Sequence, residues 1–148
     1  MANIEIIQKL RDMTGAGVMS CKKAFQEAGD DFEKAVALIK KWGLVKVGQK
    51  TDRSTGSGLL EAYIHNNRVG VLLELRCETD FVARSEIFKE LAHNLVMQIA
   101  ALDPADTESL LAQPYIKDES ITIDALAKDA IARLGENIRV ERFCRYEI

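Results

Sequence analysis

The stretch KVGQKTDRSTGSG, residues 46–58, interrupts the apolar periodicity of the chain and separates two parts of different character. Small and turn-forming residues precede Gly58 at positions 54–57, and such a composition is typical of a linker between domains. We therefore predict an N-terminal domain at residues 1–45, a linker at 46–58 and a second domain at 59–148.

The N-terminal part predicts three short helices. The first helix has apolar residues at helical spacing, Ile4, Ile7, Leu10 and Met13, and is expected to end at Gly15. The third has Phe32, Ala35, Val36, Ile39 and Trp42 at helical spacing and is expected to end at Gly43. The second helix runs from about residue 18 to 28, and Asp30 is expected to cap the third. Helices of this length do not persist alone in water, so we expect a three-helix bundle.

The second part alternates between strand and helix patterns. Apolar residues recur at every second position in 60–64 and 69–77, with Asn66-Asn67 as the turn between them. A helix is predicted from about Ser85 to Pro104, a short helix and loop after it, and another helix from Thr122 to residue 134. With a last strand, the prediction is an α+β fold: a three-stranded antiparallel sheet packed with helices.

The terminal strand carries apolar residues on both sides. Simple alternation assigns one face to Ile138, Val140, Cys144, Tyr146 and Ile148, with Arg142 as an exception. Phe143 then falls on the opposite face. Because both faces need cover, this strand predicts contact with a partner chain.

Charge and cysteine content argue against several classes of protein. The net charge is −3, and the longest basic runs are pairs of lysines, whereas nucleic-acid binding through phosphates usually needs a basic patch. Three scattered cysteines do not form a disulfide framework, and no spacing supports a metal site. Residues 1–3 lack the basic region of a signal peptide and no apolar run could span a membrane, so we expect a reduced, cytoplasmic protein with no membrane contact.

Two motifs deserve comparison with known chemistry. TGAGVMSCKK, residues 14–23, resembles a phosphate-binding loop but lacks its Gly-Lys-Ser/Thr order, so a glycine turn followed by an exposed Val18-Met19 pair is favoured. In CETDFVAR, residues 77–84, Thr79 or Asp80 can cap a short helix. Phe81 then either folds back into the core or projects toward another protein, and spacing alone leaves both open.

An enzyme is not indicated. His65 and His93 lack the serine, cysteine or carboxylate neighbours that would make either one a catalytic base. We therefore expect neither catalysis nor a cofactor.

Three segments closely resemble bacterial translation elongation factor Ts. They are LRDMTGAGVMSCKKAF (10–25), CETDFVAR (77–84) and GENIRVERFCRYE (135–147). The segments follow the family's order, and with the hairpin and helices between them the resemblance covers essentially the whole chain. The resemblance implies a guanine-nucleotide exchange factor for elongation factor Tu, with an N-terminal domain similar to ubiquitin-associated domains.

The resemblance also implies roles for individual residues. Thr79, Asp80, Phe81 and Val82 match the motif that intrudes beside the partner's magnesium and phosphates. A second set matches the contact of the N-terminal domain with elongation factor Tu: Arg11, Val18, Met19, Lys22 and Lys23. Val18 and Ser20 depart from the commoner family pattern, which has methionine and aspartate there.

The chain resembles the short members of the family, which dimerise. Cys144, with Phe143 beside it, matches a position near their dimer contact. The expected partners are elongation factor Tu, GDP-bound or nucleotide-free, and a second copy of the chain. The alternative interpretation is a dimeric adaptor whose N-terminal bundle binds peptides or ubiquitin-like folds.

Overall fold

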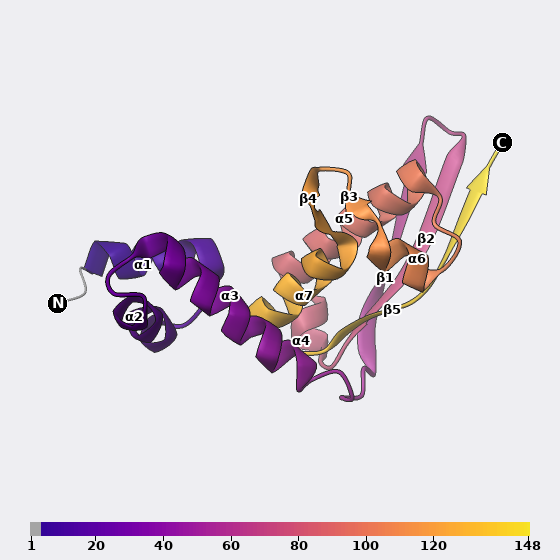
Figure 1. Cartoon of the computed structure of the whole chain (residues 1–148). Helices are drawn as coiled ribbons and strands as arrows, with labels where there is room; N and C mark the ends of the chain where they lie inside the picture. Colours follow the sequence, from indigo (N-terminus) through magenta and orange to yellow (C-terminus); the bar gives the residue numbers. More distant parts are fainter. Residues whose placement is uncertain (1–3) are drawn as a thin grey trace. The chain divides into compact units, whose positions relative to one another are not determined.

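A computed structural model gives the fold of residues 4–148 (Figure 1). Internal contacts divide the chain into two compact units, residues 1–49 and residues 50–148. Each unit has its own architecture, and we describe them in turn.

The first unit consists of three helices, α1 (Ile4–Thr14), α2 (Val18–Glu27) and α3 (Phe32–Gly48). Each buries one side, as the apolar spacing predicts, and the shared core contains Ile7, Leu10, Cys21, Ala24, Phe25, Ala35 and Ile39. The predicted three-helix arrangement is therefore confirmed, although Ile4 and Met13 lie on the exposed side of α1.

Two details of α3 differ from the prediction. The cap is Asp31, whose side chain accepts a hydrogen bond from Lys34 N at 3.1 Å, because Gly29 and Asp30 both adopt left-handed backbone angles that turn the chain first. The helix also continues past Gly43 to Gly48, where Val47 is buried. A glycine inside a helix costs only about 1 kcal/mol, so it does not end the helix here.

The second unit is built on an antiparallel sheet of β1 (Ser57–His65), β2 (Val69–Cys77) and β5 (Ile138–Glu147), in the order β1-β2-β5. Asn66 and Asn67 occupy the turn of the β1–β2 hairpin, and both have the positive φ that such a turn requires. The predicted α+β fold with a three-stranded antiparallel sheet is confirmed.

Helices lie against one face of this sheet (Figure 1). They are α4 (Asp80–Ala83), α5 (Glu86–Leu102), α6 (Thr107–Ala112) and α7 (Ile123–Leu134). Ser85 and Thr122 cap α5 and α7 as predicted, each accepting a hydrogen bond from the third residue beyond it. The core between helices and sheet contains the fully buried Leu73, Leu75, Phe88, Leu95 and Ile99.

A small hairpin between α6 and α7 is absent from the prediction, which placed only a loop there. Its strands are β3 (Pro114–Tyr115) and β4 (Asp118–Thr122). The buried Gln98 of α5 holds it by accepting from Ile116 N at 2.9 Å and donating to Pro114 O at 3.0 Å. Such short strands carry too few residues for an alternating pattern to appear in the sequence.

The last strand contains a β-bulge that the alternation argument did not anticipate. Leu75 pairs with Val140 whereas Glu74 pairs with Arg142, so Glu141 is an extra residue in β5. Side chains beyond the bulge therefore change face. Ile138 and Val140 share a face as predicted, and this face is covered by helices. Cys144 and Tyr146 lie on the other face with Arg142, which corrects the predicted pattern and removes Arg142 as an exception.

Candidate functional site

The TDFV segment forms a single helical turn directly after β2. Thr79 is the N-cap of α4, and its hydroxyl oxygen accepts a hydrogen bond from Val82 N at 3.4 Å. Ala83 is buried and Val82 is half-buried, whereas Phe81 is 81% exposed. The turn thus packs through its C-terminal residues and presents its aromatic ring to solvent. The alternative in which Phe81 folds back into the core is wrong.

Asp80 occupies the first position of this turn and is also exposed. Its carboxylate forms an ion pair with the guanidinium of Arg84, one helical turn later. An exposed pair of this kind contributes little to stability, but it limits the orientations that the Asp80 side chain adopts. Asp80 and Phe81 are therefore neighbouring exposed groups of different chemistry, one anionic and one aromatic.

The start of the turn is braced by the loop that connects α7 to β5. Glu136 Oε1 accepts from Glu78 N at 3.2 Å and from Thr79 N at 2.9 Å, and Glu136 Oε2 accepts from the Thr79 hydroxyl at 2.7 Å. In return, Glu78 Oε2 accepts from Asn137 N at 2.7 Å. Two loops far apart in the sequence are thus joined by reciprocal carboxylate–amide bonds.

Asn137 extends this network to the start of the second unit. Its side-chain amide donates to Thr51 O at 3.2 Å and to Arg53 O at 2.9 Å. Sequence reasoning assigned no role to Glu136 or Asn137. The only signal was their place in the GENIRVERFCRYE segment, directly after the glycine that ends α7.

Cys77 lies immediately before the braced turn and is fully buried. Burial raises the pKa of its thiol above the ordinary value of 9.0, and the nearby Glu136 carboxylate raises it further. Its sulfur donates a weak hydrogen bond to Thr79 O at 3.1 Å. This thiol is held protonated at neutral pH and serves as a small buried residue.

The second set of sequence-predicted residues lies on the first unit. Val18 and Met19 begin α2 and are 47% and 74% exposed, and Arg11, Lys22 and Lys23 are exposed as well. Cys21, between the lysines and Ser20, points into the core instead. The glycine turn at 15–17 therefore leads to an exposed apolar pair with cationic residues nearby, as the sequence predicts.

The sheet face opposite the helices exposes a cluster of apolar side chains, next to the charged residues Glu74, Arg76 and Arg142. Leu72, at its centre, pairs with Ala62 of β1 and with Cys144 of β5. We call this surface the free sheet face and define it by its exposed apolar residues Leu60, Ala62, Ile64, Leu72, Cys144 and Tyr146. Apolar surface of this kind is typical of sites where another protein binds.

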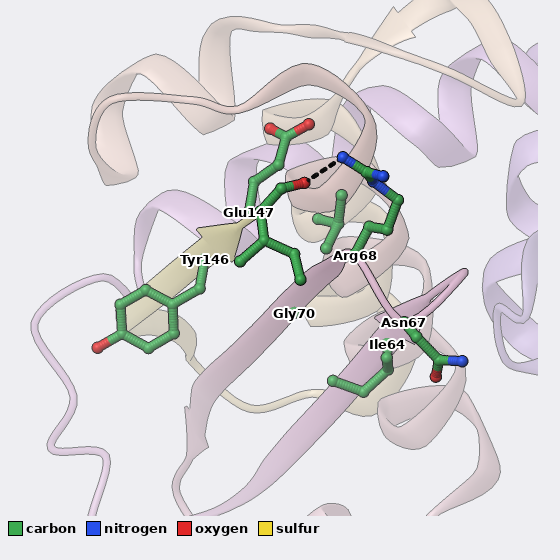
Figure 2. A pocket seen from close by; sticks show the side chains of 8 residues that line it. Ile64, Asn67, Arg68, Gly70, Tyr146 and Glu147 are labelled. Carbon is green, nitrogen blue, oxygen red and sulfur yellow. Dashed lines mark hydrogen bonds between the residues drawn. The ribbon is translucent and has the colours of Figure 1, made fainter.

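A shallow apolar hollow of about 130 Å³ lies at the hairpin end of this face (Figure 2). Ile64 and Tyr146 line it from β1 and β5, and Gly70 lies between them on β2. A Cβ on Gly70 would come within 3.2 Å of the Ile64 side chain, so glycine keeps the hollow open. The Arg68 guanidinium donates to Ile148 O at 2.7 Å and fixes its rim.

The sequence-predicted dimer residues fall on opposite sides of the sheet. Cys144 lies on the free sheet face, whereas Phe143 pairs with the buried Leu73 and faces the helices. Successive strand residues point to opposite faces, so the two side chains cannot meet the same surface. Phe143 supports the sheet from its covered side.

Two further findings concern metals and membranes. Within residues 4–148, no three His, Cys, Asp or Glu side chains come together in a way that could hold a metal ion. None of the helices in that range has the length and apolar character needed to cross a membrane.

An exposed aromatic on a braced turn and an exposed apolar sheet face are features typical of proteins that bind other proteins. The sequence profile of the family described as Elongation factor TS matches residues 78–148. Among similar proteins, Elongation factor Ts of Nostoc sp. is 48% identical over 145 residues, which cover 97% of this chain and 46% of the relative.

Two other relatives are matched over almost their whole length. Chloroplastic Elongation factor Ts of Cyanidioschyzon merolae is 44% identical over 191 residues, covering 96% of this chain and 91% of the relative. Elongation factor Ts of Thermotoga petrophila is 40% identical over 190 residues, covering 99% and 96%. The chain belongs to the elongation factor Ts family, which confirms the resemblance found in the sequence.

The relatives differ from this chain in length. The chain spans about half the length of the Nostoc relative. The alignments with the other two run over 191 and 190 positions, more than the 148 residues of this chain. Those two relatives therefore contain residues with no counterpart here.

Proposed function

We propose that this chain is a guanine-nucleotide exchange factor that binds elongation factor Tu, GDP-bound or nucleotide-free, and promotes GDP release during translation elongation in the cytoplasm. The observation that carries the proposal is Phe81, which is 81% exposed on a turn held at its base by hydrogen bonds. Family membership supports the choice of partner.

In the proposed mechanism, Asp80 and Phe81 enter beside the magnesium and phosphates of the partner. Phe81 wedges between partner side chains and displaces the helix that helps to hold the metal. An aromatic ring suits this role because it presents a large, rigid apolar surface. A ring already exposed on a fixed turn loses little conformational freedom on binding.

Exchange then follows from a coupling free energy between two ligands of one partner. If the chain binds nucleotide-free elongation factor Tu more tightly than the GDP-bound form, it must lower the affinity for GDP by the same factor. Incoming GTP releases the chain by the same reciprocity. No covalent step is needed from this chain, and the magnesium belongs to the partner.

The N-terminal unit supplies a second contact in this proposal. Val18 and Met19 would pack on a helix of the partner's nucleotide-binding domain, with Arg11, Lys22 and Lys23 at the edge of the contact. Their exposure supports the assignment. Because this contact is remote from the nucleotide, Met19→Ala should weaken binding and leave the maximal release rate at saturating factor nearly unchanged.

The test is the release of a fluorescent GDP analogue from elongation factor Tu in the presence of excess unlabelled GDP. We expect the parent protein to accelerate release strongly, and Phe81→Ala to reduce this acceleration at least about tenfold, as expected for a binding hot spot. Leu102→Ala serves as the matched control, because Leu102 is also an exposed apolar residue of the same unit. It lies at the far end of α5, roughly 25 Å of helix away.

The outcomes separate function from mechanism. No acceleration by the folded parent would overturn the proposed function. Equal acceleration by the parent and Phe81→Ala would preserve the exchange activity and reject Phe81 as the wedge. A loss with Leu102→Ala equal to that with Phe81→Ala would show that the assay reports general damage to the unit.

We further propose that two copies associate through the free sheet face, with Cys144 at the contact. The support is the exposure of Leu60, Leu72 and Tyr146 around Cys144 on a sheet face without helices. Sedimentation equilibrium under reducing conditions should give a dimer for the parent and a monomer for Leu72→Lys, because the new charge would be buried at the contact. Leu102→Lys is the control, and a monomeric parent would overturn this part of the proposal.

A further inference from the structure

We infer that Glu136 is a positioning residue for the Asp80–Phe81 turn and acts on it through Thr79. This inference rests on the proposed function and assigns a role to a residue that never has to touch the partner. Helix α4 has only four residues, and a helix that short has no stability of its own, so contacts from outside the helix must hold it in place.

The three hydrogen bonds to Glu136 hold the turn at Thr79, its N-cap, and at the residue before it. One carboxylate receives both backbone amides at the start of the turn, Glu78 N and Thr79 N, as well as the Thr79 hydroxyl. Hydrogen bonds to an ionised acceptor are stronger than neutral ones. Together they fix both the backbone and the side chain of Thr79.

Fixing the hydroxyl has a directional consequence. The Thr79 hydroxyl has one proton, and Glu136 Oε2 accepts it at 2.7 Å. The lone pairs of Thr79 Oγ1 are then the groups left to face Val82 N, which donates to that oxygen at 3.4 Å. Glu136 therefore sets the orientation of the cap, and the cap sets the turn that carries Phe81.

The brace is also two-sided. Glu78 Oε2 accepts from Asn137 N at 2.7 Å, so neither loop can shift without breaking bonds at both ends. Asn137 in turn donates through its side chain to Thr51 O and Arg53 O. Glu136 and Asn137 are adjacent, but their side chains bind different segments, since only Glu136 bonds to the residue that caps α4. This difference provides a matched pair of variants.

The first experiment measures solvent exchange of the α4 amides by NMR, without any partner. In Glu136→Ala we expect exchange at Val82 N and Ala83 N to rise at least about tenfold, because the cap loses its orientation. In Asn137→Ala we expect those amides to stay near their parental rates, although that variant loses two hydrogen bonds of its own. Unchanged α4 amides in Glu136→Ala would overturn the inference.

The second experiment is a double-mutant cycle in the nucleotide-release assay. Glu136→Ala should reduce acceleration about tenfold in the parent and cause a clearly smaller further loss in a Phe81→Ala background, because only Asp80 is then left to position. A purely structural role would give independent, multiplicative losses and would overturn the inference. Glu136→Gln, which keeps one accepting oxygen, should fall between the parent and Glu136→Ala.

The two experiments distinguish the possible failures. If the parent does not accelerate nucleotide release, the proposed function fails, yet the amide exchange still decides whether Glu136 orders the turn. If the parent is active and the α4 amides do not respond, Glu136 has no positioning role and the proposed function is unaffected.

Discussion

Gly58 of β1 and Leu75 of β2 approach each other so closely that no side chain fits between them. A Cβ added to Gly58 would lie 2.2 Å from Leu75 O and 2.8 Å from the Cα of Arg76. Gly58 also has φ +156, a conformation that residues with a side chain rarely adopt. The start of the sheet, next to the β2–α4 junction, thus depends on a glycine that the sequence marked only as the end of a linker.

We predict that Gly58→Ala destabilises the second unit by about 2–4 kcal/mol, since strained backbone and overpacking each cost of this order. Gly56→Ala is the matched control, because a Cβ at Gly56 meets nothing within 4 Å. Urea unfolding followed by circular dichroism measures both. Equal stability of the two variants would show that the strands separate here without cost.

The second prediction concerns Glu74, which lies between two arginines on the free side of the sheet. Arg76 Nε donates to it at 2.9 Å and Arg142 Nε at 3.2 Å. The hydrogen bond from Arg76 is the main cause that lowers the pKa of Glu74 below its ordinary value of 4.5, and Arg142 adds to the effect. Desolvation opposes this shift and is outweighed.

A lowered pKa in the folded state fixes the sign of the pH dependence. The unfolded chain takes up the proton first as the pH falls, so the stabilisation by ionised Glu74 is complete above about pH 4.5 and is lost as the pH drops through the lowered value. Urea unfolding between about pH 7 and pH 3 should show Glu74→Gln less stable than the parent at neutral pH, with the difference shrinking in acid. A constant difference would contradict the assignment, and Glu119→Gln is the control for removal of an exposed carboxylate.

The third prediction uses the different environments of the three cysteines. Cys21 and Cys77 are fully buried, and burial raises the pKa of both thiols, whereas Cys144 is exposed. Ellman's reagent should therefore modify Cys144 alone in the folded protein, and all three after unfolding. If two copies meet at the free sheet face, the rate at Cys144 should rise on dilution. Rapid modification of Cys21 in native protein would contradict the buried core of the first unit.

Much of the fold follows from local sequence signals. Caps and glycines at Ser85, Thr122 and Gly135 mark helix ends because the chemistry of an end is local. Asp30 and Asp31 have the same side-chain chemistry and fit the cap position equally well in the sequence, and only backbone geometry assigns the cap to Asp31. Helix α3 continues through Gly43 and buries Val47. That burial depends on tertiary packing, which no local sequence rule predicts.

Only part of the candidate site can be predicted from the sequence. Thr79 as a cap is readable from the sequence, but whether Phe81 points inward or outward depends on how Ala83 packs, which spacing does not reveal. Glu136 lies 57 residues from Thr79. A single sequence contains no signal that would join those two positions. The same limit applies to β5, where one extra residue reverses the faces of all that follow.

The last prediction tests that extra residue. Glu141 has no partner on β2, and the bulge lets Val140 and Phe143 both face the helices. Deleting Glu141 would leave a regular strand in which Val140 still pairs with Leu75 and Arg142 with Glu74, so every side chain keeps its present face. We therefore expect the deletion variant to fold and to lose less than about 2 kcal/mol in the free energy of unfolding, because no apolar residue leaves the core and no charged residue enters it. Glu141→Ala keeps the bulge and should change stability by less than about 1 kcal/mol. A loss of more than about 4 kcal/mol in the deletion variant, measured by urea unfolding, would contradict this expectation and show that the second unit needs the bend of the bulge itself.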